Sequence, residues 1–259
     1  MKYISSRDNP LYKRAQRLLA GKRIDSDVPE LALEGIHLCQ AWLEHQGEPL
    51  WAMFETDKLN RHTELAALAD RLPSHKVITC ESALMQRLSP VIQGQGVLFV
   101  VAAPEPVRPS QITQNSLWLD RVQDPGNVGT LLRTAAAAGI SHAYLSVGCA
   151  SAWSTKVLRS AQGAHFVLTI YEDVELHAEV QRLHIPLVAT ALQNAGSLYE
   201  TALPEKCAWV FGNEGQGVDA QLLDQATLRV FIPQQADVES LNVAVAAGVC
   251  LFEQRRQHS

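Results

Sequence analysis

The residues best suited to chemistry lie in one run, Asp124–Ala135, directly after the apolar segment Leu117–Leu119. A Pro-Gly pair predicts a turn into an alanine-rich helix, which we expect Asn127 to cap. Gly129 and Arg133 are four residues apart, so they share a face of that helix. A glycine that permits close approach of the backbone, beside a permanently charged guanidinium, suits a phosphate-bearing substrate. An ordinary strand-to-helix turn with a surface arginine explains the run equally well.

A second candidate run, Gly212–Gly217, follows the apolar segment Ala208–Phe211. Its three glycines let backbone N–H and C=O groups approach a ligand closely. Their spacing fits neither a dinucleotide fingerprint nor a P-loop. Glu214 has few packing reasons to stand among glycines, and its charge would repel phosphate. The loop therefore suits a ligand group other than phosphate, although a purely structural turn is the alternative.

The third run begins at Ile232 and continues at Ser240 into a strongly apolar stretch. Ser240 predicts the N-cap of a helix that is apolar on all sides and therefore buried. Asn242 falls in the first turn of that helix. A helix N-terminus offers free N–H groups, and two polar side chains there suit a polar ligand. Capping alone would also account for Ser240.

These runs must be positioned by the elements before them, which are apolar segments typical of strands and separated by helical stretches. The segments are Leu117–Leu119, Ala143–Val147, Leu187–Thr190, Ala208–Phe211 and Val230–Ile232. Nearly continuous apolar strands with helices between them predict an α/β fold, a parallel sheet covered on both faces. Ligands of such sheets bind beyond the carboxyl ends of the strands. The loops after Leu119, Thr190, Phe211 and Ile232 are therefore the candidate binding loops.

The first part of the chain predicts a separate, smaller α/β unit of short alternating elements. We expect a basic helix near the N-terminus, further helices at Ile36–His45 and Glu64–Arg71, and strands at Leu31–Leu33, Trp51–Phe54, Lys76–Thr79 and Gly96–Val101. Three prolines between residues 103 and 109 cannot sustain a helix or a central strand, so they mark a linker. The predicted organisation is an N-terminal domain at 1–103, a linker at 104–110 and a second domain at 111–259.

Composition indicates a soluble globular protein, with 47% hydrophobic and 19% charged residues. The sequence has no apolar run long enough to cross a bilayer and no apolar N-terminal core of a signal peptide, so we expect a cytoplasmic protein without a membrane partner. The five cysteines are dispersed without a C-x-x-C pair, and the histidines form no H-E-x-x-H. We therefore expect reduced thiols and no metal site.

The charge distribution is uneven. Residues 1–23 carry seven basic side chains against Asp8 alone, a charge of +6 in a chain whose total is −5. The basic residues are Lys2, Arg7, Lys13, Arg14, Arg17, Lys22 and Arg23. Such an arm favours contact with a polyanion. The alternative is a solvated helix face, because Tyr12, Ala15, Leu18 and Leu19 form an apolar stripe at helical spacing. Both can hold at once.

Together the three runs resemble the three motifs of the SpoU family of RNA ribose 2′-O-methyltransferases, within the knotted SPOUT class. The residues that carry the resemblance are Asn127, Gly129 and Arg133–Ala135, then Phe211–Gly215, then Ile232, Pro233 and Ser240–Ala244. Their order and spacing agree with the family over residues 115–253, and residues 157–164 are similar to its segment between the first two motifs. Two N-terminal segments, Ile4–Pro10 and Leu33–Gly35, resemble the small RNA-binding domain that precedes the catalytic domain in many members.

The resemblance implies transfer of a methyl group from S-adenosylmethionine to a ribose 2′-hydroxyl of structured RNA, with rRNA favoured over tRNA. It also implies a catalytic α/β domain with a C-terminal trefoil knot, which works as a homodimer. By the same resemblance the cofactor is held by Gly212, Ile232 and Leu241, largely through backbone groups, with Thr190 nearby.

By resemblance the catalytic group comprises Arg133, Asn127, Glu214, Ser240 and Asn242. Arg133 is the leading candidate, either as the base or, because guanidinium stays protonated, as a clamp on phosphate and forming alkoxide. Asn127 would orient Arg133 or the ribose. Glu214 would stand near the sulfonium or anchor Arg133, and Ser240 and Asn242 would complete the pocket.

Two other functional classes compete with this reading. One is an RNA-binding or ribosome-assembly factor on the same scaffold that has lost catalysis. The other is a small-molecule hydrolase or kinase, which lacks support because the sequence contains no G-x-S-x-G, P-loop or metal-ligand cluster.

Overall fold

The computed structural model describes residues 2–22, 24, 28–88, 94–191, 193–235 and 240–259. Two compact units make up the chain. The N-terminal unit comprises Met1–Pro104 with Trp153–Thr155, and the C-terminal unit comprises Glu105–Ala152 with Lys156–Ser259. The division between Pro104 and Glu105 falls within the proline-rich segment.

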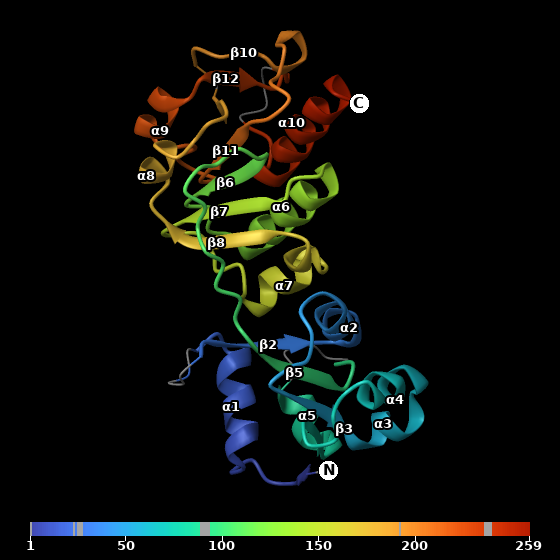
Figure 1. Cartoon of the computed structure of the whole chain (residues 1–259). Coiled ribbons are helices and arrows are strands. Elements are labelled where there is room, and N and C mark those ends of the chain that lie inside the picture. The colour runs from blue at the N-terminus through green and yellow to red at the C-terminus, as the bar shows by residue number, and fades with distance from the viewer. Residues whose placement is uncertain (1, 23, 25–27, 89–93, 192, 236–239) are drawn as a thin grey trace. The chain divides into compact units, whose positions relative to one another are not determined.

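The N-terminal unit contains a five-stranded sheet (Figure 1). In spatial order its strands are β1 (Lys2–Ile4), β4 (Val77–Cys80), β3 (Trp51–Glu55), β5 (Val97–Ala102) and β2 (Glu30–Glu34). Strand β4 pairs in parallel with β1 and β3, whereas β5 runs antiparallel to β3 and β2. The helices are α1 (Pro10–Leu19), α2 (Ile36–His45), α3 (Thr56–Arg61), α4 (Thr63–Asp70) and α5 (Ser82–Leu88). Strand β1 and helices α3 and α5 were not predicted, and each has seven residues or fewer.

Helix α1 shows how the basic arm combines packing with charge. Tyr12, Ala15 and Leu18 are buried in the core of the unit, which confirms the predicted apolar stripe. On the same helix, Lys13 pairs with Asp8 at 2.7 Å and Arg14 pairs with Glu30 at 2.6 Å. Part of the predicted positive charge is thus neutralised within the unit. Arg7, Arg17 and Lys22 are exposed, and Arg23 lies outside the described residues.

The C-terminal unit contains a seven-stranded sheet whose neighbouring strands all pair in parallel. The spatial order is β10 (Gly196–Ser197), β12 (Leu228–Phe231), β9 (Leu187–Thr190), β11 (Ala208–Gly212), β6 (Ser116–Asp120), β7 (His142–Ser146) and β8 (Thr169–Val174). The five predicted strands are all present, so the predicted α/β fold with a parallel sheet is confirmed. The two unpredicted strands, β8 and β10, form the edges of the sheet. Strand β8 is only partly buried, and β10 has only two residues.

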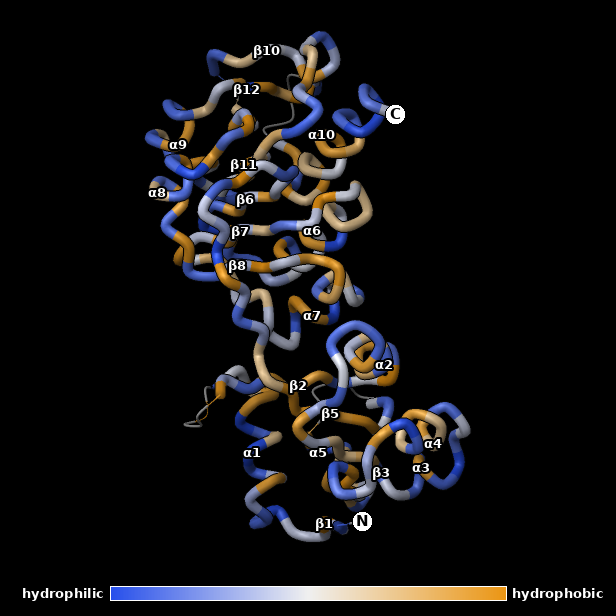
Figure 2. The backbone as a smooth tube through the Cα atoms, viewed as in Figure 1, coloured by the Kyte–Doolittle hydropathy of each residue, from blue (hydrophilic) through white to orange (hydrophobic). Residues whose placement is uncertain are grey.

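Helices cover both faces of this sheet (Figure 1). Helices α6 (Pro125–Ala138), α7 (Thr155–Ala161) and α10 (Val243–Gln257) lie on one side, and α8 (Leu176–Val180) and α9 (Ala220–Gln225) lie on the other. Figure 2 shows hydrophobic residues concentrated along the central strands. Trp118 packs in a core cluster with Leu176 and Leu222 of α8 and α9, whereas Trp209 donates to Gln254 of α10 at 2.8 Å. Alternate strand residues thus serve the two faces.

Both predicted helix caps are wrong by a few residues. Asp124, rather than Asn127, caps α6, because its carboxylate accepts the Asn127 N–H at 2.8 Å and Pro125 then opens the helix. Asn242, rather than Ser240, caps α10, and its side-chain oxygen accepts the N–H groups of Ala244 and Val245.

Helix α10 is also not buried on all sides. Val245 is 54% exposed and Phe252 is 47% exposed. The two residues lie seven apart and therefore on one face of the helix. The apolar composition of α10 thus reflects an uncovered stripe as well as a buried one.

Candidate active site

The carboxyl ends of adjacent parallel strands bring the first two motifs together. Strands β6 and β11 pair with Asp120 opposite Gly212. The loop that enters α6 and the loop Gly212–Gly217 therefore leave the sheet side by side. The side chains that these loops carry lie beyond the carboxyl ends of the strands, as the sequence predicts.

A chain of hydrogen bonds joins one side chain from each of the three motifs. Asn127 Nδ2 donates to Glu214 Oε1 at 2.9 Å, and Asn242 Nδ2 donates to Asn127 Oδ1 at 2.9 Å. We call Glu214, Asn127 and Asn242 the amide chain. Residues separated by 87 and 115 positions in sequence are thereby held in one arrangement.

The amide chain has a defined direction because its far end is fixed by a helix. The oxygen of Asn242 accepts from the backbone of α10 at 3.0 and 3.3 Å, so its NH2 group must face Asn127. The NH2 group of Asn127 in turn faces Glu214. The positive N-terminus of α10 thus connects, through two amides, to a carboxylate, and each bond polarises the next in the same sense.

Glu214 is held in its charged form. Partial burial acts to raise the pKa of Glu214, but hydrogen bonds from Asn127 and from backbone N–H groups outweigh that effect and lower it below its usual value. The backbone donors are Gln123 N at 3.4 Å and Asp124 N at 3.3 Å. The side chain stays exposed, so its negative charge is available to a cationic ligand.

The glycine at the end of β11 is required by the loop itself. A Cβ on Gly212 would lie 2.1 Å from the carbonyl carbon of Gly217 and from the nitrogen of Val218. The loop closes tightly because Asn213 and Gly217 exchange backbone hydrogen bonds at 3.0 and 2.8 Å. A bulky residue at position 212 therefore disrupts the loop itself, and such a variant would report on folding as well as on cofactor affinity.

Gly129 serves helix packing rather than substrate approach. It is buried, and a Cβ there would lie 2.8 Å from the backbone oxygen of Val157 and 1.7 Å from Ser160 Oγ. Its role is to let α6 pack closely against α7. The prediction that Gly129 approaches a phosphate is wrong, because α7 already occupies that side of the helix.

Arg133 and Ser240 lie outside the amide chain. Both are exposed, and within the described part of the chain the Arg133 guanidinium has no hydrogen bond or ion pair. Among the described residues neither Glu214 nor Asn127 bonds to Arg133, because Glu214 binds Asn127 and Asn127 in turn binds Asn242. Of the two roles expected for each residue, the contact with Arg133 is therefore not observed, and the roles at the sulfonium and the ribose stay predictions. Arg133 lies six positions after Asn127 along α6, which is an axial rise of about 9 Å.

The residues predicted to hold a cofactor lie at the ends of β11 and β12 and before α10. Gly212 is buried, Ile232 is half-buried, and Leu241 is 36% exposed. Thr190 ends the intervening strand β9 and is half-buried. Partly exposed apolar side chains next to backbone groups and an anionic Glu214 suit a ligand that combines an aromatic ring with a positive charge. Among the described residues there is no cluster of metal-ligating side chains, and none of the described helices is long and apolar enough to cross a membrane.

Three further residues support the site and were not predicted. Asp124 caps α6, and Asn213 Oδ1 accepts the N–H groups of Gly215 and Gln216 at 2.9 and 3.0 Å. Arg121 contacts both flanks of the Gly212–Gly217 loop. An Asn that precedes a glycine-rich turn is a known signal for such side-chain-to-backbone bonds. No comparable pattern in the neighbouring sequence indicates the role of Arg121.

The fold and the site define a class of RNA-modifying methyltransferases. A crystal structure described as an RNA 2′-O ribose methyltransferase superimposes with a TM-score of 0.78 and 27% identity, covering 99% of each chain. A structure of an AdoMet-bound rRNA methyltransferase from Sinorhizobium meliloti gives a TM-score of 0.81 and 25% identity, covering 98% of this chain and 97% of that one.

The sequence pattern of the SpoU rRNA Methylase family matches residues 114–252. The chain belongs to this family. An uncharacterised tRNA/rRNA methyltransferase of Synechocystis is 35% identical over 98% of this chain and 93% of its own length. The 23S rRNA (guanosine(2553)-2′-O)-methyltransferase RlmP of Bacillus subtilis is 44% identical over 54% of this chain and 57% of its own length.

Proposed function

We infer that the protein is an S-adenosylmethionine-dependent methyltransferase that acts on a ribose 2′-hydroxyl of RNA, with rRNA as the substrate. Family membership and the similarity to an AdoMet-bound rRNA methyltransferase support this function. The single structural observation that carries it is the amide chain, because it unites polar residues of all three motifs at one edge of the sheet.

The residues fit the needs of this reaction. S-adenosylmethionine supplies an electrophilic methyl group on a sulfonium. Glu214 would face that positive charge, while Ile232 and Leu241 would contact the apolar parts of the cofactor beside the backbone at Gly212. Asn127 and Asn242 each keep one N–H of the side-chain amide outside the chain, so they would orient the ribose oxygens.

Arg133 would act on the substrate rather than on the protein. An exposed guanidinium remains protonated, so we assign it to the RNA phosphate next to the reacting ribose and to the developing alkoxide. The phosphate itself would help to receive the hydroxyl proton. Ser240 would complete the pocket from the segment before α10.

The alternative of a catalytically inactive RNA-binding or assembly factor is not favoured. An inactive factor would not need a carboxylate and two amides in one polarised arrangement. In this protein all three side chains are present and bonded to one another in a chain. Cofactor binding without methyl transfer would be its signature.

Incubation with labelled S-adenosylmethionine and separate rRNA and tRNA pools tests the function. Label should enter rRNA as a 2′-O-methyl ribose, identified in the nuclease-digested product. Label on a base would contradict the reaction type, label confined to tRNA would contradict the substrate, and cofactor binding without label in either pool would favour the inactive factor.

We assign RNA binding to the N-terminal unit, as a domain over 1–103 joined by a linker at 104–110 to the catalytic domain at 111–259. The exposed cations Arg7, Arg17 and Lys22 support this assignment, because RNA attracts basic side chains that the protein has not already paired.

We also assign a homodimer formed through the catalytic domain. The exposed apolar side chains Val245 and Phe252 on one face of α10 favour a protein partner there. Light scattering of the purified protein should give twice the chain mass, and Phe252→Asp should reduce it. The trefoil knot stays a prediction that rests on the family, and the cytoplasmic location stays a prediction from the sequence.

A further inference from the structure

Arg121 stands where the first two motifs meet, directly after β6. Its backbone φ is +54°, a left-handed conformation that few residues with a side chain adopt. Its N–H donates to Ser146 Oγ at 2.8 Å, and its carbonyl accepts from Asn213 Nδ2 at 2.9 Å. The main chain of Arg121 thus already links β7 to the Gly212–Gly217 loop.

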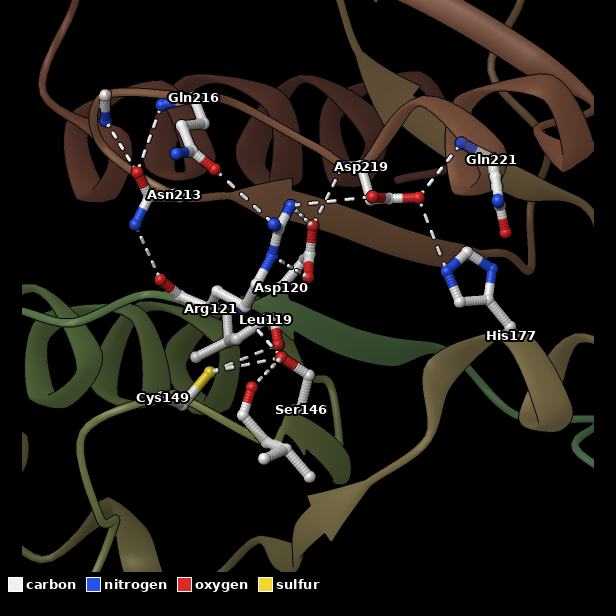
Figure 3. Close-up of polar contacts among 12 residues, drawn as sticks. Leu119, Asp120, Arg121, Ser146, Cys149, His177, Asn213, Gln216, Asp219 and Gln221 are labelled. Atoms are coloured by element: carbon white, nitrogen blue, oxygen red, sulfur yellow. Dashed lines mark hydrogen bonds and ion pairs between the residues drawn. The ribbon is translucent and has the colours of Figure 1, made fainter.

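The side chain of Arg121 contacts three further groups around that loop (Figure 3). Nε and Nη2 donate to the two carboxylate oxygens of Asp120 at 3.0 Å each. Nη1 donates to Gln216 Oε1 at 3.5 Å, and Nη2 lies 3.9 Å from Asp219 Oδ2. One guanidinium therefore contacts Asp120 at the end of β6, Gln216 in the loop and Asp219 two residues beyond the loop.

Asp120 makes this arrangement sensitive to the loss of the guanidinium. Asp120 is only 4% exposed, and it also accepts the Asp219 N–H at 2.8 Å. A buried carboxylate needs a paired cation, and Arg121 supplies it in a two-point contact. The hydrogen bond with Asp120 raises the pKa of Arg121, so the cation remains charged.

The surroundings of Arg121 argue against a direct role in RNA binding. Asp120 and Asp219 together supply two negative charges to a single guanidinium, and Asp219 lies 3.4 Å from His177 Nε2 (Figure 3). A group already held by carboxylates offers little attraction to phosphate. Arg121 instead differs from Arg133, which keeps its charge unpaired within the described residues.

We propose that Arg121 is a positioning residue for the cofactor loop, whose guanidinium holds Gly212–Gly217, and with it Glu214, in the conformation that binds S-adenosylmethionine. This proposal rests on the function proposed above. A glycine at position 121 would adopt the same φ without strain. The strained backbone at an arginine indicates that the side chain has a role: it contacts the loop at Gln216, while Asn127 binds Glu214 of the same loop.

The substitution Arg121→Gly separates the guanidinium from the backbone. Glycine keeps φ near +54° and leaves both main-chain hydrogen bonds in place, so only the side-chain contacts are lost. The double variant Asp120→Asn/Arg121→Gly also removes the buried charge, while Asn still offers an oxygen to the Asp219 N–H. If the single variant folds poorly because Asp120 is left unpaired, the double variant still tests the loss of the guanidinium.

Arg229→Ala is the matched control. Arg229 also pairs with a carboxylate, Asp224 at 3.0 Å, and donates to a backbone carbonyl, that of Leu223 at 2.9 Å. It lies on β12 and contacts neither the loop nor the amide chain. Loss of an ion pair as such should therefore alter thermal stability in this variant while cofactor affinity stays unchanged.

Calorimetric titration of the full-length variants with S-adenosylmethionine tests the proposal. We expect the Kd to rise about tenfold in both Arg121 variants, the KM for the cofactor to rise with it, and kcat at saturating cofactor to fall less. Arg121→Lys should restore part of the affinity. Unchanged affinity in a folded Arg121→Gly or double variant overturns the positioning role alone. Absence of binding by the unsubstituted protein overturns the proposed function and the positioning role together.

Discussion

The amide chain and Arg133 both depend on helix α6, yet the protein holds them in opposite ways. Glu214, Asn127 and Asn242 bond to one another and to backbone groups of two elements. Arg133 extends into solvent without a bonded partner among the described residues. In the proposed function, the groups assigned to the cofactor and the ribose are thus ordered in advance, whereas the group assigned to phosphate is left for the incoming RNA to order.

Removal of Arg133 should have the largest effect on turnover. Arg133→Ala should lower kcat about 10³-fold, because one donor at a developing charge is worth that much. Its affinity for S-adenosylmethionine and its melting temperature should stay unchanged, since the side chain is exposed. Single-turnover methylation, calorimetry and thermal melts measure the three quantities. Near-normal turnover would remove Arg133 from the mechanism, and Arg133→Lys should recover only part, lacking the planar fork.

Disruption of the amide chain at Asn242 should have the next largest effect on catalysis. In Asn242→Asp the carboxylate still caps α10, but it cannot donate to the Asn127 oxygen and repels it. We expect kcat/KM to fall about 10²-fold with little change in melting temperature.

The matched variant Asn242→Ala removes the cap as well. It should lose a similar amount of activity and, in addition, about 1 kcal/mol of the free energy of unfolding. Equal activity in Asn242→Asp and the unsubstituted protein would contradict a role for the polarised chain and would reduce Asn242 to a helix cap.

The salt dependence of RNA binding should distinguish the role of Arg133 from that of the amide chain. If Arg133 contacts a phosphate, Arg133→Ala should reduce the slope of log affinity against log salt by about one. Asn242→Ala should leave that slope unchanged, because neither asparagine nor alanine bears a charge to pair with phosphate. Filter binding of the substrate RNA over a salt series measures both slopes, and equal slopes for all three proteins would place Arg133 away from the backbone of the RNA.

The smallest effect concerns pH. The pKa of Glu214 is lowered in the folded protein from its ordinary value of 4.5, so its charge stabilises the fold above that value. This contribution is lost as the pH falls through the lowered pKa. Glu214→Gln should therefore show a flatter loss of melting temperature than the unsubstituted protein between about pH 6 and about pH 3. Parallel curves would indicate that the carboxylate is not held by Asn127.

The sequence predicted the alternating central strands and helices well, but it predicted the exact ends of the helices poorly. The central strands of the C-terminal unit are nearly continuous apolar runs, and such runs are diagnostic once helices separate them. The edge strand β8 contains Glu172 and Asp173, which removed that signal. Caps were misplaced because several residues near each helix start are good cappers, and only the tertiary environment selects among Asp124 and Asn127, or Ser240 and Asn242.

The sequence also predicted that Asn127, Glu214 and Asn242 lie in one site, but it did not predict their contacts. Residue types and motif order brought Asn127, Glu214 and Asn242 to one edge. Which side chain bonds to which depends on the register of β6 against β11 and on the cap of α10, and neither is encoded locally. Gly129, which the sequence suggested for close approach to a ligand, serves helix packing, because it faces α7. Gly212 faces Gly217 and Val218 at the end of its own loop, and its contact with the cofactor stays a prediction.

Helix α10 connects the candidate active site, at its N-terminal cap, to a buried part of the core near its other end. Its capping residue is Asn242, and near its other end the buried Gln254 binds Trp209 and the carbonyl of Pro204. We therefore expect the two ends of α10 to unfold together, in one cooperative opening of the helix. Amide hydrogen exchange along α10 should show uniform slow protection rather than graded fraying.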